Sequence, residues 1–323
     1  MTIKQMMENQ PEVIRLLKGS YEHDFLSHAY MFEGGEGSGT YEGAIYMSML
    51  LLCESDNKPC FRCHNCIRIE KNNHLNILCI EPQNDLIKRE QIDEFIHEFN
   101  TTSLEQGPKV GIIKDADKMN SSASNAILKL LEEPAPNHYI FLLTKNKERI
   151  LDTIISRTQV IQFKPIPQKF VMKTLEDCGV EKTMSFVLSY LTSDIDSAKE
   201  MIAEGKVYDL LTLAMGIEKQ IALKKDPFVF FYKNSSYLKS EVDKKWHRTF
   251  LDILLLINKE IVNIYNGKAS IVFSDVTSLY NKENIDINKI THQIDVINKY
   301  QERLNYYVNL NLFYTSLMVE INK

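Results

Sequence analysis

The sequence predicts an α/β domain with a parallel sheet, followed by a helical remainder. Over about residues 10–160, short apolar runs of strand length alternate with segments of helical periodicity, which is typical of a parallel sheet covered by helices on both faces. From about residue 166 the strand-like runs largely disappear and apolar residues recur at helical spacing. With 323 residues, the chain is long enough for two or three domains, each with its own core.

The first part is expected to contain strands and helices in alternation, with a further strand-like run, TQVIQF, after Arg157. In chain order they are helix 11–18, strand 29–32, helix 42–52, strand 75–82, helix 88–100, strand 109–115, helix 121–131 and strand 139–144. Within 42–52, Ile45, Met49 and Leu52 recur on one helical face. The apolar run 75–82 predicts a buried strand.

The second part is expected to be a helical bundle. Short amphipathic helices are predicted within 167–203, and apolar residues follow helical spacing over 207–223, 244–265 and 288–321. In the 244–265 segment the apolar positions Phe250, Leu254, Ile257 and Ile261 lie on one face, as in a helix that packs against others.

Composition and charge exclude several classes of protein. With 44% hydrophobic and 25% charged residues, 12 Gly and 9 Pro, the chain is neither disordered nor fibrous. A formal net charge of -5 argues against a protein that coats nucleic acid by bulk electrostatics. The first residues lack the apolar core of a signal peptide, and the longest aliphatic run, Ile253 to Ile257, is too short to span a bilayer. We expect a cytoplasmic protein with no membrane segment.

A Gly-rich loop between the first predicted strand and the next helix is the setting in which backbone N–H groups hold phosphates. Three glycines have the G-x-x-G-x-G spacing of a phosphate loop: Gly34, Gly37 and Gly39. The next two places, where Lys and Ser or Thr would contact phosphate and Mg²⁺, hold Thr40 and Tyr41, and no Lys or Arg occurs from residue 19 to 57. We expect the shape of a phosphate loop without its chemistry; an ordinary glycine turn is the alternative.

Four of the six cysteines form a C-x6-C-x2-C-x2-C cluster. They are Cys53, Cys60, Cys63 and Cys66. Four thiolates complete a tetrahedral Zn²⁺ shell, so the spacing predicts a structural zinc site. An iron–sulfur cluster and separate buried thiols are the alternatives, and the run lacks the x3-C-P ending of the bacterial ferredoxin motif. His64 could replace one ligand, whereas Cys79 and Cys178 are expected to be core thiols.

Two further segments carry polar residues at strand ends. Asp115 follows the strand 109–115 where an ATPase would hold Mg²⁺, but Ala116 comes next, and Asp117 is expected to face elsewhere. A metal role and a capping role for Asp115 both stay open. In the later segment Thr144 and Asn146 end a strand, and Arg157, taken alone, is a solvated arginine.

Taken together, these segments resemble the AAA+ clamp-loader family of bacterial DNA polymerase III. The resemblance rests on HAYMFEG, the four-Cys insert, SNAILKLLEEP and ISR, covers about residues 5–165, and continues weakly to NLNLFYTSLMVE. It implies a P-loop NTPase-like AAA+ ATPase-like domain at 1–165 with a zinc knob at 53–66, a small helical lid domain at 166–206, and a helical collar at 207–323 through which five subunits assemble.

The chain departs from relatives that hydrolyse ATP at four places. Those relatives have Lys and Thr in the loop, Glu after the strand-end Asp, and Arg on a lid helix, where this chain has Thr40, Tyr41, Ala116 and Asp196. The resemblance therefore implies a non-catalytic subunit that binds no ATP. The pair Ser156–Arg157 is retained, and in the family it faces the ATP site of the next subunit, so Arg157 is expected to act as an arginine finger in trans.

The resemblance also implies partners. They are clamp-loader ATPase subunits of the gamma/tau type and a delta subunit in a hetero-pentamer, with the sliding clamp and primer–template DNA reached through this component of the DNA polymerase III holoenzyme. Two other functions stay open. One is an ATPase motor in its own right, which would need a cation from outside the loop. The other is a zinc module that binds DNA directly. The negative net charge of the chain argues against direct DNA binding.

Overall fold

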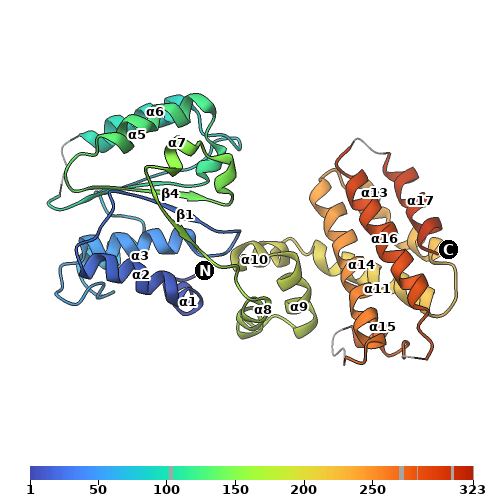
Figure 1. Cartoon of the computed structure of the whole chain (residues 1–323). Coiled ribbons are helices and arrows are strands. Elements are labelled where there is room, and N and C mark those ends of the chain that lie inside the picture. Colours follow the sequence, from blue (N-terminus) through green and yellow to red (C-terminus); the bar gives the residue numbers. More distant parts are fainter. Residues whose placement is uncertain (102–104, 269–272, 282, 307–308, 323) are drawn as a thin grey trace. The chain divides into compact units, whose positions relative to one another are not determined.

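The structure is a computed structural model that describes residues 1–101, 105–268, 273–281, 283–306 and 309–322. The chain forms two compact units, Met1–Ile166 and Pro167–Lys323. The first unit is α/β and the second is helical (Figure 1). This confirms the predicted fold class, while the division of the second unit into a lid and a collar stays a prediction.

The first unit is built on one parallel sheet of five strands. The strands are β1 (Ala29–Glu33), β2 (Ile77–Ile80), β3 (Lys109–Ile113), β4 (His138–Thr144) and β5 (Gln159–Gln162). Their order is β2-β3-β4-β1-β5, so the first strand in the chain is an interior strand that lies between β4 and the edge strand β5. In the register, Phe32 of β1 lies opposite Leu143 of β4 and Ile161 of β5. The carboxyl ends of β1, β4 and β5 therefore meet at one edge of the sheet.

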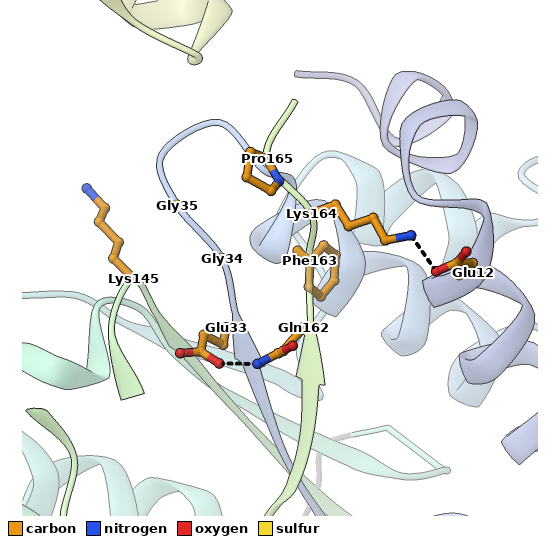
Figure 2. Close-up of a pocket in the computed structure, with 9 residues that line it drawn as sticks. All are labelled: Glu12, Glu33, Gly34, Gly35, Lys145, Gln162, Phe163, Lys164 and Pro165. Atoms are coloured by element: carbon orange, nitrogen blue, oxygen red, sulfur yellow. Dashed lines mark hydrogen bonds and ion pairs between the residues drawn. The ribbon is translucent and has the colours of Figure 1, made fainter. Parts of the chain in front are cut away.

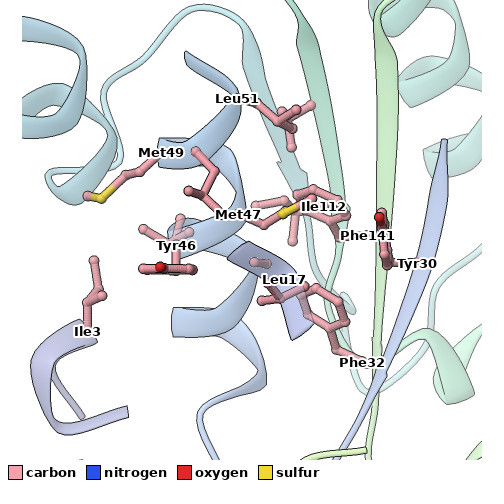
Figure 3. Close-up of a cluster of buried hydrophobic side chains, with 14 of the residues drawn as sticks. Ile3, Leu17, Tyr30, Phe32, Tyr46, Met47, Met49, Leu51, Ile112 and Phe141 are labelled. Carbon is pink, nitrogen blue, oxygen red and sulfur yellow. The ribbon is translucent and has the colours of Figure 1, made fainter. Parts of the chain in front are cut away.

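Helices cover both faces of this sheet (Figure 1). On one side lie α1 (Ile3–Asn9), α2 (Pro11–Glu22) and α3 (Thr40–Leu52), and α4 (His64–Glu70) packs on α3. On the other side lie α5 (Arg89–Asn100), α6 (Ser121–Glu132) and α7 (Asp152–Ile155), with the 3-10 turns η1 (Ala116–Lys118) and η2 (Lys147–Arg149) in the connections. Figure 3 shows the first core, where Leu17 and Met47 point toward Phe32 and Phe141 of the sheet.

The central strands are buried on both faces, which explains their uninterrupted apolar sequence. Ala29 to Phe32 of β1 are each 0% exposed, and residues on alternate sides enter the two different cores. β2 differs from its prediction of a buried strand, because it is one of the two edge strands and is only half-buried. Its Cys79 is exposed, and so is Cys178 at the end of α8 (Gln168–Asp177), so the expectation that both are core thiols was wrong.

The second unit contains helices of very different lengths. After α8 they are α9 (Lys182–Leu191), α10 (Ile195–Ala203), α11 (Lys206–Ala222), α12 (Pro227–Asn234), α13 (Ser236–Ser240), α14 (Lys244–Tyr265), α15 (Ser274–Thr277), α16 (Ile287–Arg303) and α17 (Leu310–Ile321). The apolar face predicted for α14 is buried against α11 and α16. The predicted segment 288–321 is two helices, α16 and α17. In the described parts of the chain, no helix combines the length and the apolar character needed to cross a membrane.

Candidate functional site

The Gly-rich loop has the geometry that its sequence predicts. β1 ends at Glu33, the loop follows, and α3 begins at Thr40. Gly37 (φ 71°) and Gly39 (φ 92°) take left-handed backbone conformations, which favour glycine. The loop lies at the carboxyl ends of β1 and β4, because the N–H of Gly34 donates to the carbonyl of Thr144 at 3.0 Å. This is the edge of an α/β sheet where ligands bind.

Side chains from other segments pack closely around this loop. A Cβ on Gly43, in the first turn of α3, would collide with the Phe163 ring, and one on Gly39 would lie 2.7 Å from Cγ of Met6. The hydroxyl of Ser38 turns back over Gly34, where it is buried and has no hydrogen-bond partner among the described residues. The loop is thus packed from both sides by this chain's own residues.

Gln10 connects the loop to the end of the first unit. Its Nε2 donates to the carbonyl of Ser38 at 3.0 Å and to that of Lys164 at 2.7 Å, while its Oε1 accepts from the N–H of Lys164 at 3.1 Å. Gln10 is only 2% exposed, so these bonds are shielded from water. The loop and the segment after β5 are therefore fixed to each other without a ligand between them.

At the position of the metal-binding Ser or Thr of a phosphate loop, Tyr41 makes contacts of its own. The Nζ of Lys114 lies 4.4 Å from the centre of the Tyr41 ring, a cation–π contact, and the Tyr41 hydroxyl donates to Oδ1 of Asn72 at 2.7 Å. Asp115, with a left-handed φ of 46°, forms an ion pair with Lys118 at 3.4 Å. The two side chains expected near Mg²⁺ are thus engaged with cationic and amide groups of the protein.

Asp117 and Thr144 join the ends of β3 and β4. Oδ1 of Asp117 accepts from the Thr144 hydroxyl at 2.9 Å and from the N–H of Lys145 at 3.3 Å. Asn146 caps η2, with its Oδ1 accepting from the N–H of Glu148 at 2.9 Å. Asp117 does face away from Asp115, but the reason is the turn η1, since the strand has already ended at Ile113.

An open pocket of about 490 Å³ lies beside the loop (Figure 2). Its walls include Glu33, Gly34, Lys145 and Lys164. Figure 2 shows Glu33 bound to Gln162 of β5, at 3.1 Å from Nε2 to Oε2, and Lys164 paired with Glu12 at 2.7 Å.

The lysines around this pocket each have a carboxylate within 4 Å. The pairs, besides the one with Glu12, are Lys147–Glu33 at 3.2 Å and Lys145–Glu36 at 3.8 Å. Burial raises the pKa of Glu33, but hydrogen bonds from Lys147 and Gln162 outweigh it, so that pKa is lowered overall and the carboxylate stays charged at neutral pH. These lysines lie in segments that are distant from the Gly-rich loop in the sequence. No local motif therefore identifies them as neighbours of the loop.

The four cysteines lie together as their spacing predicts. One ligand atom from each of Cys53, Cys60, Cys63 and Cys66 lies within 4.8 Å of the others, and the Sγ atoms of Cys53 and Cys63 are 3.9 Å apart. Sulfurs bound at 2.3 Å to a tetrahedral Zn²⁺ lie about 3.8 Å apart, so the cluster fits the ion. His64 is exposed and lies outside the cluster.

Local structure places these thiols. Cys53 follows the last residue of α3, and Cys63 is the N-cap of α4, with its Sγ accepting from the N–H of Cys66 at 3.4 Å. The backbone N–H of Arg62 lowers the pKa of Cys60 to about 6, while burial raises the pKa of Cys53 and Cys66. A bound cation would favour the thiolate form of all four.

Arg157 lies just after α7, at the surface of the first unit. Its guanidinium donates from Nη1 to the carbonyl of Thr153 at 2.9 Å and to Oγ of Ser156 at 3.4 Å. Nη2 pairs with Oε1 of Glu132, the last residue of α6, at 2.7 Å, and the Arg157 side chain is 36% exposed. The expected finger residue is thus accessible and held by its own chain, and no sequence motif identifies Glu132 as its partner.

Asp196, expected where active relatives have a lid arginine, lies in the first turn of α10 in the second unit. An acidic side chain there cannot stabilise phosphate charge.

Comparisons with known proteins identify the family to which this chain is similar. A family model described as "DNA polymerase III, delta subunit" matches residues 9–167. DNA polymerase III subunit delta' of Bacillus subtilis (strain 168) is 32% identical over 311 residues, which cover 95% of this chain and 94% of that protein. DNA polymerase III subunit gamma of a Buchnera aphidicola strain is 26% identical over 296 residues, covering 89% of this chain and 74% of that protein.

Among solved structures, a DNA polymerase III gamma subunit-related protein from Thermotoga maritima has a similar fold. Its TM-score is 0.51 at 15% sequence identity, and the match covers 95% of this chain and 98% of that one. The similarity to the Bacillus protein extends over nearly the whole of both chains. The chain therefore belongs to the delta' family of DNA polymerase III clamp-loader subunits.

Proposed function

We propose that this chain is a non-catalytic subunit of the clamp loader, which assists ATP-driven loading of the sliding clamp onto primed DNA. In this proposal it supplies Arg157 to the ATP site of a neighbouring gamma/tau-type ATPase subunit, within a hetero-pentamer that also contains a delta subunit. It thereby works as part of the DNA polymerase III holoenzyme in the bacterial cytoplasm, where the chromosome lies.

The observation that carries the non-catalytic role is the state of the chain's own phosphate loop. The first two positions of α3 hold Thr40 and Tyr41, and the ammonium group of Lys114 makes a cation–π contact with the Tyr41 ring. Ala116 stands where a carboxylate would orient the attacking water, so both charge stabilisation and water positioning are missing. The paired lysines of the neighbouring pocket offer no ready substitute for the loop cation, which counts against a motor in its own right.

The observation that favours a role in trans is the accessibility of Arg157. A guanidinium at a subunit boundary can stabilise the charge of a transferring γ-phosphoryl group, an effect on the order of a thousandfold or more in rate. Arg157 is the charged side chain that the family resemblance assigns to this task, and it is partly exposed at the surface of its unit.

The proposed cofactor is one structural Zn²⁺, held by Cys53, Cys60, Cys63 and Cys66. A closed set of four thiolates leaves no open position for a substrate, so the ion would serve to fold the segment between α3 and α4. No nucleotide is expected on this chain.

The test is a reconstituted complex of gamma/tau-type subunits, a delta subunit and this chain, with wild-type or Arg157→Ala protein. Clamp-stimulated ATPase should fall partially, because only the site that faces this chain is affected, and clamp loading should fall more. Arg157→Lys should rescue little, since a point charge cannot reproduce the forked contact of a guanidinium.

Three results would each point elsewhere. Unchanged rates in an intact Arg157→Ala complex would reduce the chain to a scaffold. Turnover by the isolated wild-type chain that follows its own purification peak would favour the motor function. Salt-dependent DNA binding by the isolated chain would favour the zinc module that binds DNA directly.

A further inference from the structure

The ion pair between Glu132 and Arg157 joins two elements that both end at this surface. α6 ends at Glu132, and Arg157 follows α7, which packs against α6 (Figure 1). The pair is short, at 2.7 Å, although the Glu132 side chain is 48% exposed. Charge-assisted hydrogen bonds of this length are the stronger ones.

These contacts use only part of the guanidinium. Nη1 is bound to the Thr153 carbonyl and to Ser156, and one proton of Nη2 points to Glu132. Of the five N–H donors of an arginine, Nε–H and the second N–H of Nη2 are thus left over, since the contacts with described residues use only Nη1 and one proton of Nη2. A phosphoryl oxygen from outside the chain can bind there without displacing Glu132.

We propose that Glu132 is a positioning residue for Arg157. Its carboxylate fixes the guanidinium in the orientation that presents the remaining donors to a neighbouring phosphate. This inference rests on the proposed function of Arg157 and goes beyond it, because it assigns to a second residue the geometry of the finger.

The physical basis is preorganisation. A free arginine has many rotamers, and it loses that freedom when it binds a phosphate. A side chain that its own chain already holds has lost the freedom beforehand, so more of the contact energy is available to the transition state. Glu132 also neutralises part of the charge, but its exposure to water keeps that effect small.

The first experiment uses the same reconstituted complex with Glu132→Ala and Glu132→Gln. At saturating ATP, clamp loading with Glu132→Ala should be slower by roughly twofold to fivefold, with an unchanged half-saturating ATP concentration. Glu132→Gln keeps an acceptor oxygen and should retain part of the rate. The matched control is Glu133→Gln, an exposed neighbour for which the structure gives no ion pair among the described residues; it should behave as wild type.

A double-mutant cycle separates positioning from a general structural effect. Adding Glu132→Ala to Arg157→Ala should cause no further loss, because the residue it positions is already absent. In the isolated full chain, NMR of the guanidinium nitrogens should show hindered rotation of the Arg157 side chain in wild type and free rotation in Glu132→Ala. This second measurement needs no complex and no ATP.

The outcomes are distinguishable. If Arg157→Ala slows loading while Glu132→Ala matches Glu133→Gln, the positioning role is overturned and the finger stands. Additive losses in the cycle, or faster loading with Glu132→Ala, also overturn it, the latter because Glu132 would then restrain the finger. If Arg157→Ala has no effect, the proposed function itself fails.

Discussion

At the level of single residues, a substitution of Thr40 tests the proposal that the phosphate loop is inactive. Thr40→Lys restores the charge that a phosphate loop carries, at the first residue of α3. Tyr41 would still lie beneath Lys114 and Ala116 would still lack a carboxylate. We therefore expect no ATPase activity above that of the wild-type chain in a phosphate-release assay.

The matched comparison is a triple variant, Thr40→Lys with Tyr41→Thr and Ala116→Glu, assayed beside the single change. Turnover by Thr40→Lys alone would show that the missing cation is the sole defect of the loop, contrary to the contacts of Tyr41.

Glu218 of α11 provides a test of pH dependence in the helical unit. It is 0% exposed, and Nδ2 of Asn258 donates to its Oε1 at 2.6 Å. Burial raises the pKa of Glu218 to about 7, from an ordinary value of 4.5. Because the folded protein then holds the proton more tightly than the unfolded chain, the free energy of unfolding decreases as pH rises from about 4.5 to about 7, by about 3 kcal/mol in all.

Glu218→Gln stays neutral and should remove this decrease. We expect the variant to match wild type in urea unfolding at pH 4.5 and to exceed it by about 3 kcal/mol at pH 8. Glu302→Gln, an exposed position on α16, serves as the control and should follow wild type at both pH values. An equal pH slope in Glu218→Gln and wild type would contradict the buried neutral carboxyl.

At the level of elements, the four-cysteine cluster governs the segment between α3 and α4. We expect one Zn²⁺ and no iron per chain by elemental analysis of freshly reduced protein. Cys63→Ser removes a ligand but keeps a side-chain acceptor at the N-cap of α4, so metal content should be lost and amide exchange should rise over residues 53–70 because the metal is missing. Exchange in α14 should not change, since it belongs to a separate unit with its own core.

Cys178→Ser is the control for this experiment, because Cys178 is exposed and lies outside the cluster. Retention of zinc by Cys63→Ser, or finding iron in the wild-type protein, would contradict the assignment.

The elements differ in how far their sequence could predict them. The strands β1, β3 and β4 follow from apolar runs because both of their faces are buried. β2 has the same kind of run, yet Cys79 is exposed, since strand order decides which strand is at the edge and periodicity carries no such information. The α4 helix was missed because it is short and begins within the cysteine cluster.

For the candidate site as well, short motifs could be predicted from the sequence, whereas contacts between distant residues could not. The cysteines and the glycine loop are motifs of close spacing, so they could be found in the sequence. The hydrogen bonds between Gln10 and Lys164 join residues that are 154 positions apart. The ion pair of Glu132 with Arg157 depends on how α6 and α7 pack against each other. The tertiary fold decides which residues form such long-range contacts. A single sequence contains no local pattern from which these contacts can be predicted.

At the level of the whole molecule, the two units have separate cores, and in the first unit the earliest strand, β1, is an interior strand whose two neighbours come much later in the chain. β1 pairs with β4 on one side and with β5 on the other. β1 therefore has no strand partner until β4 has been made, and lacks its second partner until β5 has been made.

This order has a consequence for biosynthesis. Between the appearance of β1 and that of β4, a ribosome needs roughly 5 to 20 s at the usual rate of 5–20 residues per second, and during this time the apolar strand Ala29–Phe32 has no sheet to enter. Nascent chains stalled before residue 138 should be cleaved throughout this region in a pulse of protease, whereas chains stalled with residue 166 well outside the exit tunnel should be protected. Equal protection at both lengths would mean that the helices shield β1 first. Until the sheet closes, the newly made domain is a natural client for a chaperone that binds short apolar segments.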